Sequence, residues 1–268
     1  MQLKHPRPVS TARRRAAFTL MEILVVVSII LILAAIALPV YSTVLSRANK
    51  AAALNNMRQT TAALISYAGQ NDGDFPDENI LVGTSWATAS TAAGEKAWFN
   101  VLPRLMGRKG VGDYANNKTA YYTKDNLLFL PGAQYPLGPA RIVKPFFAFA
   151  INTKLQSKDK VTKLKSKAKL SQITHPSRTV AFLEEGIPGE PKAMAIQPAY
   201  EGEPKSAGRS FVERYGGHGV ITFLDGHAEN LAAKDLLTST GLLKVPAEFK
   251  PPGETAIVWR RTPEEDPN

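Results

Sequence analysis

A run of eighteen residues without a charged side chain, residues 23–40, constrains this chain more than any other feature. At about 1.5 Å of rise per residue, an α-helix of this length spans about 27 Å, close to the hydrocarbon thickness of a bilayer. Secretory signal peptides carry a shorter apolar region of about 7–15 residues. The basic residues before the run favour a cytoplasmic N-terminus, with the rest of the chain on the other side. The run therefore predicts one membrane-spanning helix.

Two features of this run ask for an explanation. Glu22 lies at the edge of the run. Because a charge in hydrocarbon costs about 2.5–3.5 kcal/mol on insertion scales, an acidic residue at this position suggests a functional role. The simpler alternative is an interfacial acid that reaches water. Ala35 and Ala37 form a small-x-small pattern, and cleavage after Ala37 would release a secreted protein. The length of the run favours a retained span over that cleavage.

The stretch RRRAAFTLMEILVVVSIILILAAIALPVY, residues 13–41, resembles the class III signal and transmembrane helix of type IV pilins and type II secretion pseudopilins. That family has a basic leader, a small residue, and then Phe-Thr-Leu-x-Glu at the start of a hydrophobic helix. The resemblance implies that a prepilin peptidase cuts between Ala17 and Phe18 and N-methylates Phe18. Ala17 stands where the family usually has glycine. Residues 1–17 would then be a leader that is removed.

The resemblance also implies roles for two residues of the helix. Glu22, fifth from the cut, matches the family's acid, and it would neutralise the new amine of Phe18 in a neighbouring subunit. Paired in this way, two charges become tolerable in the apolar layer, whereas each alone is costly. Pro39, twenty-second from the cut, matches a proline that loosens or kinks the helix, because it removes one backbone hydrogen bond.

Beyond the membrane span, residues 18–40, the pattern predicts an amphipathic helix over residues 41–69 that continues into a soluble head. Its apolar face follows steps of three and four residues: Val44, Ala48, Ala51, Leu54, Met57, Thr61, Leu64 and Ala68. Gly69 and the turn-rich sequence NDGDFP then end the helix. A plain membrane anchor with a juxtamembrane helix would give the same periodicity.

Residues 70–262 predict an α+β head with a small antiparallel sheet. Together with this head, the resemblance of residues 13–41 implies a pilin-like fold. Strands are expected at residues 142–152, 179–183 and 220–224, with a late strand at residues 257–259. A helix is expected at residues 95–107, with a buried face made of Trp98, Phe99, Leu102 and Leu105. Residues 263–268 are expected to be a disordered tail.

The stretch RYGGHGVITFLDGHAENL, residues 214–231, predicts a β-hairpin. Asp225-Gly226 suits a two-residue type I′ turn, in which both residues have positive φ. The stretch is similar to the prepilin-type processing-associated motif, in which His, nine residues, Asp-Gly and usually a second His follow one another. Asp225, Gly226 and His227 match this motif, whereas Tyr215 stands where the first His is expected. The sequence THPSRTVAFLEE, residues 174–185, resembles the usual approach to it.

Four side chains of this region could in principle hold a metal: His218, Asp225, His227 and Glu229. Asp225 and His227 flank a turn, however, and the spacing fixes no third ligand. Asp225 and Glu229 remain a weak calcium candidate, by similarity to the calcium loops of major pseudopilins, and a plain hairpin turn is the favoured interpretation. The chain lacks the G-x-S-x-G, H-E-x-x-H, P-loop and Rossmann patterns, so neither an enzyme nor a cofactor is predicted.

The net charge of +10 is not by itself a sign of nucleic-acid binding, because the leader supplies five of the positive charges. Residues 154–169 contain seven lysines and one aspartate, which predicts a solvated loop. Nucleic-acid contact there is not favoured, because no interleaved aromatic residue could stack on a base. The absence of cysteine excludes disulfides and thiolate metal sites.

Together these features predict a structural subunit of a type II secretion pseudopilus or a type IV pilus. It would sit in the bacterial inner membrane with a periplasmic head, and its partners would be other subunits, a prepilin peptidase and an inner-membrane assembly platform. Head-to-tail assembly gives an open helical filament. The main alternative is a membrane-anchored envelope binding module that is processed but does not polymerise. A secreted enzyme is the least favoured interpretation.

Overall fold

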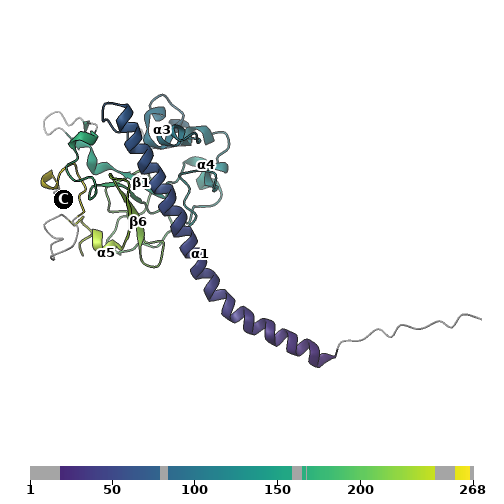
Figure 1. Cartoon of the computed structure of the whole chain (residues 1–268). Coiled ribbons are helices and arrows are strands. Elements are labelled where there is room, and N and C mark those ends of the chain that lie inside the picture. Colours follow the sequence, from purple (N-terminus) through teal and green to yellow (C-terminus); the bar gives the residue numbers. More distant parts are fainter. Residues whose placement is uncertain (1–18, 79–83, 159–164, 167, 245–256, 266–268) are drawn as a thin grey trace, which may run out of the picture. The chain divides into compact units, whose positions relative to one another are not determined.

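A computed structural model of the chain describes residues 19–78, 84–158, 165–166, 168–244 and 257–265. The predicted leader, residues 1–17, lies outside the described residues. The chain divides into two compact units, residues 1–45 and residues 46–268. A single helix of 51 residues, α1 (Leu20–Gln70), contributes to both units (Figure 1). Its end lies within two residues of the predicted one.

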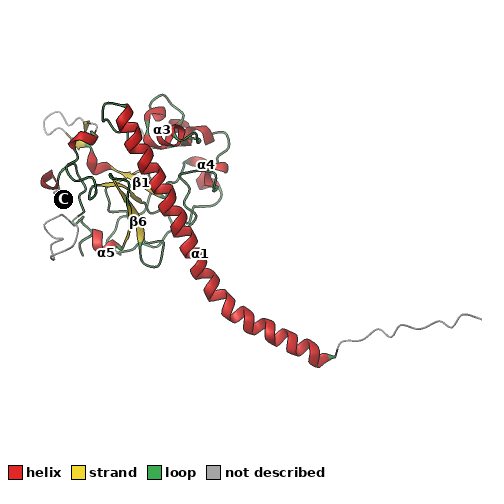
Figure 2. Ribbon diagram, viewed as in Figure 1, coloured by secondary structure: helices red, strands yellow, loops and turns green. Residues whose placement is uncertain are grey.

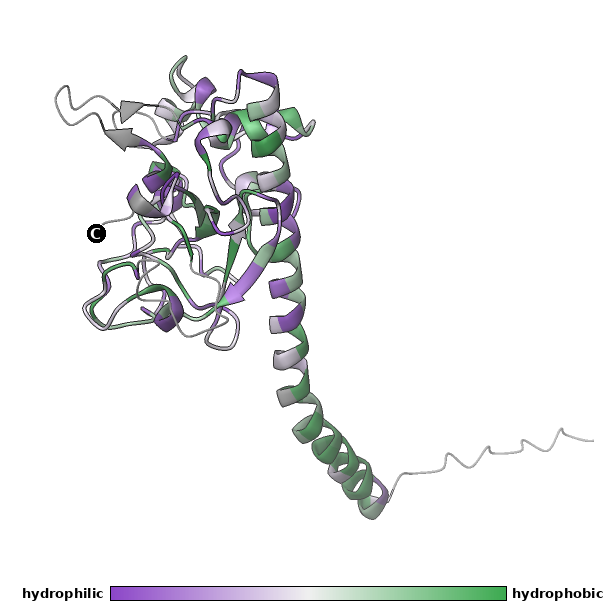
Figure 3. Cartoon of the chain, turned by 60° about the vertical axis from the view of Figure 1, so that its left-hand side comes forward, coloured by the Kyte–Doolittle hydropathy of each residue, from purple (hydrophilic) through white to green (hydrophobic). Residues whose placement is uncertain are grey.

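The described part of the first unit is the N-terminal half of α1, which is hydrophobic along its length (Figure 3). Its apolar side chains are open to the surroundings, and Leu20 and Leu38, for example, are 85% and 71% exposed. Among the described residues, α1 is the one helix long and apolar enough to cross a membrane. The helix continues without a break through position 39, and a bend at Pro39 stays a prediction.

In the second unit, called the head below, α1 buries one face. The buried residues again follow helical spacing: Ala53, Met57, Thr60, Thr61, Ala63, Leu64 and Ala68. Val44, Ala48 and Ala51 were predicted on this face but are exposed, because the buried face of the helix begins only at Ala53. Thr61 Oγ1 donates a hydrogen bond of 2.7 Å to Thr222 Oγ1 and so joins the helix to the sheet.

The head contains a five-stranded sheet in the order β5-β1-β4-β6-β7. Figure 2 draws its strands in yellow. The strands are β1 (Phe149–Asn152), β4 (Val180–Glu184), β5 (Lys205–Ser206), β6 (Gly219–Phe223) and β7 (Ala228–Leu231). The β1–β4, β4–β6 and β6–β7 pairs are antiparallel, as predicted. The sheet is nevertheless mixed, because β5 pairs with β1 in parallel. The long connection between these two strands permits this arrangement, which the short strand-like runs did not reveal.

Short elements surround the sheet. The helices are α2 (Trp86–Ala89), α3 (Trp98–Leu105), α4 (Pro139–Val143) and α5 (Ala233–Leu236). The 3-10 turns are η1 (Gly94–Lys96), η2 (Val111–Tyr114), η3 (Ala120–Tyr122), η4 (Thr153–Leu155), η5 (Leu170–Gln172) and η7 (Pro263–Glu265). The lysine-rich segment contains a small antiparallel pair, β2 (Ser157–Lys158) and β3 (Lys165–Ser166), while residues 159–164 and 167 lie outside the described part.

Four predictions differ from the structure. The strand expected from residue 142 begins only at β1, because Pro139 starts the helix α4, a position that suits proline. Leu105 lies at the end of α3 and is 41% exposed, whereas the other three predicted face residues are buried. Val258 makes only an isolated bridge to Thr179 instead of a strand. Within the expected disordered tail, η7 is ordered, and residues 266–268 are outside the described part.

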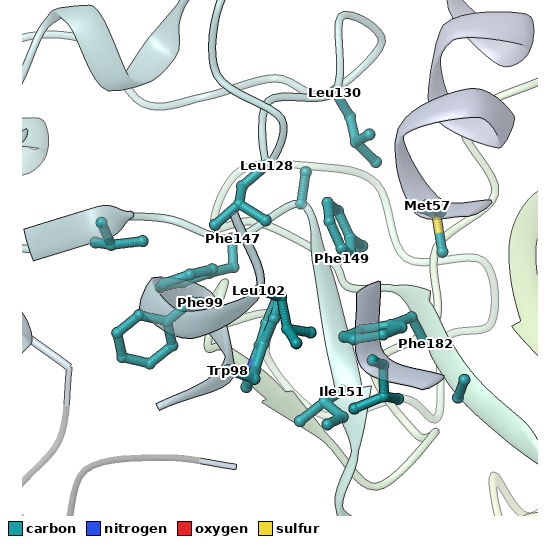
Figure 4. Packing of buried hydrophobic residues seen from close by; sticks show 14 of the residues in the cluster. Met57, Trp98, Phe99, Leu102, Leu128, Leu130, Phe147, Phe149, Ile151 and Phe182 are labelled. Carbon is teal, nitrogen blue, oxygen red and sulfur yellow. The ribbon is translucent and has the colours of Figure 1, made fainter. Parts of the chain in front are cut away.

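The core of the head is aromatic (Figure 4). The Trp98 ring lies 5.0 Å from the ring of Phe182, 5.8 Å from that of Phe149 and 6.0 Å from that of Phe99. Its indole N–H donates to the carbonyl of Pro204 at 2.8 Å, so its polar atom is satisfied although the side chain is fully buried. This core fixes α1, α3 and the sheet relative to one another within the head.

Candidate functional site

The two head segments that the sequence singled out, residues 174–185 and 214–231, meet at a buried ion-pair cluster. Arg214 Nη1 lies 3.1 Å from Glu184 Oε1, and Arg214 Nη2 lies 2.6 Å from Glu190 Oε2. Arg214 Nε donates a second bond to Glu190, at 2.8 Å, which makes that pair bidentate. All three side chains are at most 3% exposed. An ion pair desolvated to this degree needs such complete hydrogen bonding to be tolerated.

Backbone groups complete the cluster. Arg214 also donates to the carbonyl oxygens of Ala148 and Glu185, at 2.7 and 2.6 Å. The remaining oxygen of Glu184 accepts from Val220 N at 2.9 Å, and Glu190 accepts from backbone N–H groups on two loops. Sequence reasoning missed this cluster. Its one signal was the pair of acids that ends an apolar run at Glu184, and no spacing rule connects that pair to residues 190 and 214.

The electrostatics of the cluster follow from burial and from one shared cation. Burial acts to raise the pKa of Glu190, but the hydrogen bonds and positive charge of Arg214 lower it overall. Burial also raises the pKa of Glu184, against the effect of Arg214. The neighbouring carboxylates outweigh desolvation and raise the pKa of Arg214, so the guanidinium stays charged. Arg214 is therefore the fixed positive centre of this part of the head.

Tyr215, which stands where the processing-associated motif has its first His, is part of the same buried region. Its side chain is 6% exposed, and a Cβ placed on Gly132 would lie 2.7 Å from the Tyr215 ring. Burial, together with the negative charge of Glu184, raises the pKa of the Tyr215 hydroxyl. The position is thus filled by a packed, neutral phenol.

The Asp225-Gly226 turn connects β6 and β7, as predicted, but its type differs. Gly226 N donates to Phe223 O at 2.9 Å, and Phe223 N donates to His227 O at 3.0 Å, which closes a three-residue loop. Gly226 has φ +94°, whereas Asp225 is not among the described residues with positive φ. This pattern corresponds to a type I turn followed by a left-handed glycine, so the two-residue type I′ prediction was wrong. The positive φ of Gly226 is the backbone conformation that the prediction gave this residue, and it favours glycine.

The turn does bring Asp225, His227 and Glu229 together. Asp225 Oδ1 lies 2.5 Å from His227 Nδ1, and Glu229 Oε1 lies 3.3 Å from His227 Nε2. The imidazole stacks on the Phe223 ring at 4.4 Å. The two carboxylates therefore lie on opposite sides of one imidazole and do not converge on a common point.

This arrangement gives no support to the weak calcium candidate. His218 is occupied elsewhere, with its Nδ1 at 3.1 Å from the carbonyl of Gly216. Within the part of the chain that the structure describes, no three His, Cys, Asp or Glu side chains are arranged to hold a metal ion. The hairpin is best described as a turn with a histidine held between two acids.

In the first unit, Glu22 lies in the first turn of α1 and forms a capping box with Thr19. Glu22 Oε2 accepts from Thr19 N at 2.8 Å and from Thr19 Oγ1 at 2.9 Å, while Glu22 N donates to Thr19 Oγ1 at 3.2 Å. Two of the helix's unpaired N–H groups are satisfied in this way. Residues 19–45 contain no Lys, Arg or His, so the charge of Glu22 has no opposite charge in this stretch.

The comparison with known families concerns this same region. Residues 12–38 match the model of the prokaryotic N-terminal methylation motif. The chain carries a prepilin-type N-terminal methylation motif. Such a motif is typical of type IV pilins and pseudopilins, and it implies processing by a prepilin peptidase. No curated protein and no solved structure was found to match the chain.

The methylation motif covers three of the predicted site residues and leaves the others out. Ala17, Phe18 and Glu22 lie inside the match, although Ala17 and Phe18 are outside the described residues; Pro39 lies just beyond it. The hydrophobic half of α1 agrees with membrane anchoring of a prepilin. The head has the α+β architecture of a pilin-like fold, which typically has no catalytic role. The match ends long before the hairpin, so the C-terminal resemblance stays a hypothesis.

Proposed function

We propose that this protein is a structural subunit of a type II secretion pseudopilus or a type IV pilus-like filament. A prepilin peptidase would cut between Ala17 and Phe18 and methylate Phe18, leaving the processed chain in the inner membrane with a periplasmic head. The observation that carries the proposal is that the methylation motif runs directly into a helix whose apolar side chains are exposed over residues 20–45. That surface requires lipid before assembly and neighbouring helices after it.

Glu22 is the residue we assign to assembly. Thr19 donates two hydrogen bonds from neutral groups to one carboxylate oxygen, Oε2, but the net charge remains uncompensated in an apolar layer. Processing creates an amine at Phe18, and an axial stagger between subunits could bring one chain's carboxylate to its neighbour's amine. Pairing is worth most where the dielectric constant is low. Other subunits and an inner-membrane assembly platform are the partners that this role requires.

The mature N-terminus is the first test. Intact-mass analysis of membrane-purified protein should show a chain that begins at methylated Phe18. The variant Ala17→Gly should be processed faster, and the bulky Ala17→Leu should block processing. A chain that starts at Met1 or at Leu38 would contradict the proposal.

Filament imaging is the second test, because it separates the subunit from the alternative role. Two fractions are examined by electron microscopy with a label on the head: material sheared from the cell surface, and the periplasm of cells that overexpress the protein. At least one of them should contain labelled filaments. Correct processing at Phe18 without any labelled filament would instead favour a membrane-anchored envelope module that does not polymerise.

A further inference from the structure

Glu185 is a third buried glutamate beside the Arg214 cluster, and its backbone is firmly held. Its N–H donates to the carbonyl of Ala148 at 2.9 Å, and its carbonyl accepts from Arg214 Nη2 at 2.6 Å. The residue is 2% exposed, and its Oε2 is buried without a hydrogen-bond partner. A buried polar atom left in this state asks for an explanation.

The segment that covers this carboxyl group is residues 201–211, which includes the edge strand β5. The hydroxyls of Ser206, on β5, and Ser210 face the carboxyl group. Backbone bonds attach the segment to the sheet and its flanks: Gly202 N to Gly186 O at 3.0 Å, Gly186 N to Ser210 O at 2.9 Å, Phe147 N to Gly202 O at 2.9 Å and Ile151 N to Pro204 O at 3.2 Å. Two of these bonds cover the outer edge of the sheet next to β1. Side chains hold both parts of the segment as well, because Trp98 Nε1 donates to Pro204 O at 2.8 Å and Phe211 is fully buried.

The charges around Glu185 do not balance. The cation that acts on it among the described residues is Arg214, and the donors of Arg214 already serve Glu184 and Glu190. Glu203 faces Glu185 from the covering segment with a like charge, although Lys144 pairs with Glu203 at 2.8 Å. The phenol of Tyr200 is another titratable neighbour in the described part of the head. Burial is the main reason why the pKa of Glu185 rises to about 8, while the two serine hydroxyls and Arg214 act to lower it.

We propose that Glu185 is a proton-operated latch on this edge of the sheet. With its proton bound, the neutral carboxyl group lies among the serine hydroxyls and residues 201–211 stay on β1. Without the proton, a buried carboxylate lacks a cation of its own, and hydration of that charge requires the covering segment to lift. Because β5 is only two residues long, local release is easier than unfolding of the head. Release uncovers the backbone edge of β1, a surface suited to pairing with another strand.

The sign of the pH effect follows from the two states of the carboxyl group. In the unfolded chain it ionises near its ordinary value of 4.5, whereas in the folded head it keeps its proton up to about pH 8. The folded state therefore binds more protons between these values, and the stability contributed by this group falls as pH rises through that window. Above about pH 8, we expect residues 201–211 to open as the main response of the head to ionisation of Glu185.

Hydrogen exchange of the full-length chain in detergent tests the latch. Protection factors, corrected for the intrinsic pH dependence of exchange, are compared at about pH 6.5 and about pH 9, where the carboxylate outnumbers the acid about tenfold. Protection over residues 201–211 should fall about thirtyfold, because the free energy of opening decreases as pH rises from about 6.5 to about 8. Helix α3 should keep its protection and serves as the internal reference. Unchanged protection over residues 201–211 would overturn the proposal.

Two variants show whether Glu185 is the responsible group. Glu185→Gln, which cannot ionise, should abolish the pH-dependent loss of protection. The matched control Glu203→Gln removes a neighbouring acid on the covering segment and should leave that loss in place. If Glu185→Gln does not fold, glutamate-labelled infrared spectra of the wild type decide. A protonated carboxylic acid band at neutral pH that disappears above about pH 8 supports the latch, and its absence at neutral pH refutes it.

Discussion

The two units of this chain differ in how the charges of their acidic side chains are compensated. In the head, Glu184 and Glu190 are buried and share the guanidinium of Arg214, which sits between them with a side chain only 3% exposed. In the first unit, Glu22 is exposed on an apolar helix, and the described part of that unit contains no cation. Among the described residues, the hydroxyl and backbone N–H of Thr19 donate the hydrogen bonds to its carboxylate.

This difference distinguishes acidic residues that stabilise the fold from an acidic residue that serves assembly. A charge that is compensated inside the same chain, as in the head, can stabilise the folded state and needs nothing from outside. A charge left without an opposite partner in an apolar layer is costly in the isolated subunit, so its retention points to a partner outside the chain. The comparison therefore predicts that changes at the Arg214 cluster act on folding, whereas changes at Glu22 act on assembly.

The largest expected effect is loss of the head fold in Arg214→Met. The substitution leaves Glu184 and Glu190 buried without a cation, and breaking a buried pair in this way costs about 3–5 kcal/mol of unfolding free energy. The matched control is Arg104→Met, because Arg104 pairs with Glu95 and Asp113 on the surface and is 33% exposed. That loss should be about 0–1 kcal/mol. Urea unfolding of the full-length variants in detergent measures both, and equal losses would refute the distinction.

The second effect is loss of filaments in Glu22→Gln. Glutamine can still accept the hydrogen bonds of the capping box, so this change removes the charge and keeps the cap. Thr19→Val removes the cap and keeps the charge. We expect Glu22→Gln to lower filament yield at least about tenfold, the equivalent of about 1.4 kcal/mol, and Thr19→Val to lower it less. The measurement is sheared filament per unit of processed membrane protein, with Ser28→Ala as the control for the helix.

The same experiment decides between two explanations of Glu22. If capping is its whole role, Thr19→Val should reduce filament yield as much as Glu22→Gln does. If the residue is only an interfacial acid that reaches water, both variants should assemble as well as the wild type. Neither substitution should change the unfolding of the head, which distinguishes them from Arg214→Met.

The sequence predicted the first unit better than the head, and the reason is the range of the interactions. The motif around Phe18 and Glu22 is continuous, so its residues can be recognised without any knowledge of the fold. The strands β4 and β6 were also predicted, since each is one short apolar run. The Arg214 cluster depends on tertiary contacts between segments up to 66 residues apart, from Arg214 to Ala148, and the parallel pairing of β5 depends on a long connection.

A third, smaller effect concerns the hairpin. Gly226 has φ +94°, and a Cβ added there would meet no atom within 4 Å, so a substitution strains the backbone without a steric clash. Gly226→Val should cost about 1–2 kcal/mol of head stability. Gly226→Asn should cost less, because asparagine visits left-handed conformations more readily. Thermal unfolding of the head measures both. Equal costs would mean that the hairpin does not depend on the backbone conformation of this residue.

The smallest effect is expected for Asp225→Asn, and it tests whether the acidic turn has any role beyond geometry. Asp225 Oδ1 accepts from His227 N at 3.0 Å, and asparagine keeps an oxygen at that position. Because Asp225 and His227 are about one-third exposed, loss of the charge should change the unfolding free energy by no more than about 0.5 kcal/mol. Glu229→Gln provides the matched change on the other side of the imidazole, at 3.3 Å from Nε2.

The measurement is thermal unfolding of both variants with calcium and with a chelator. If the acids only orient His227, calcium should not shift the unfolding temperature of the wild type or of the variants. If instead calcium stabilises the wild type and Asp225→Asn removes that shift, the turn binds a cation, and the side-chain arrangement around His227 must rearrange to do so.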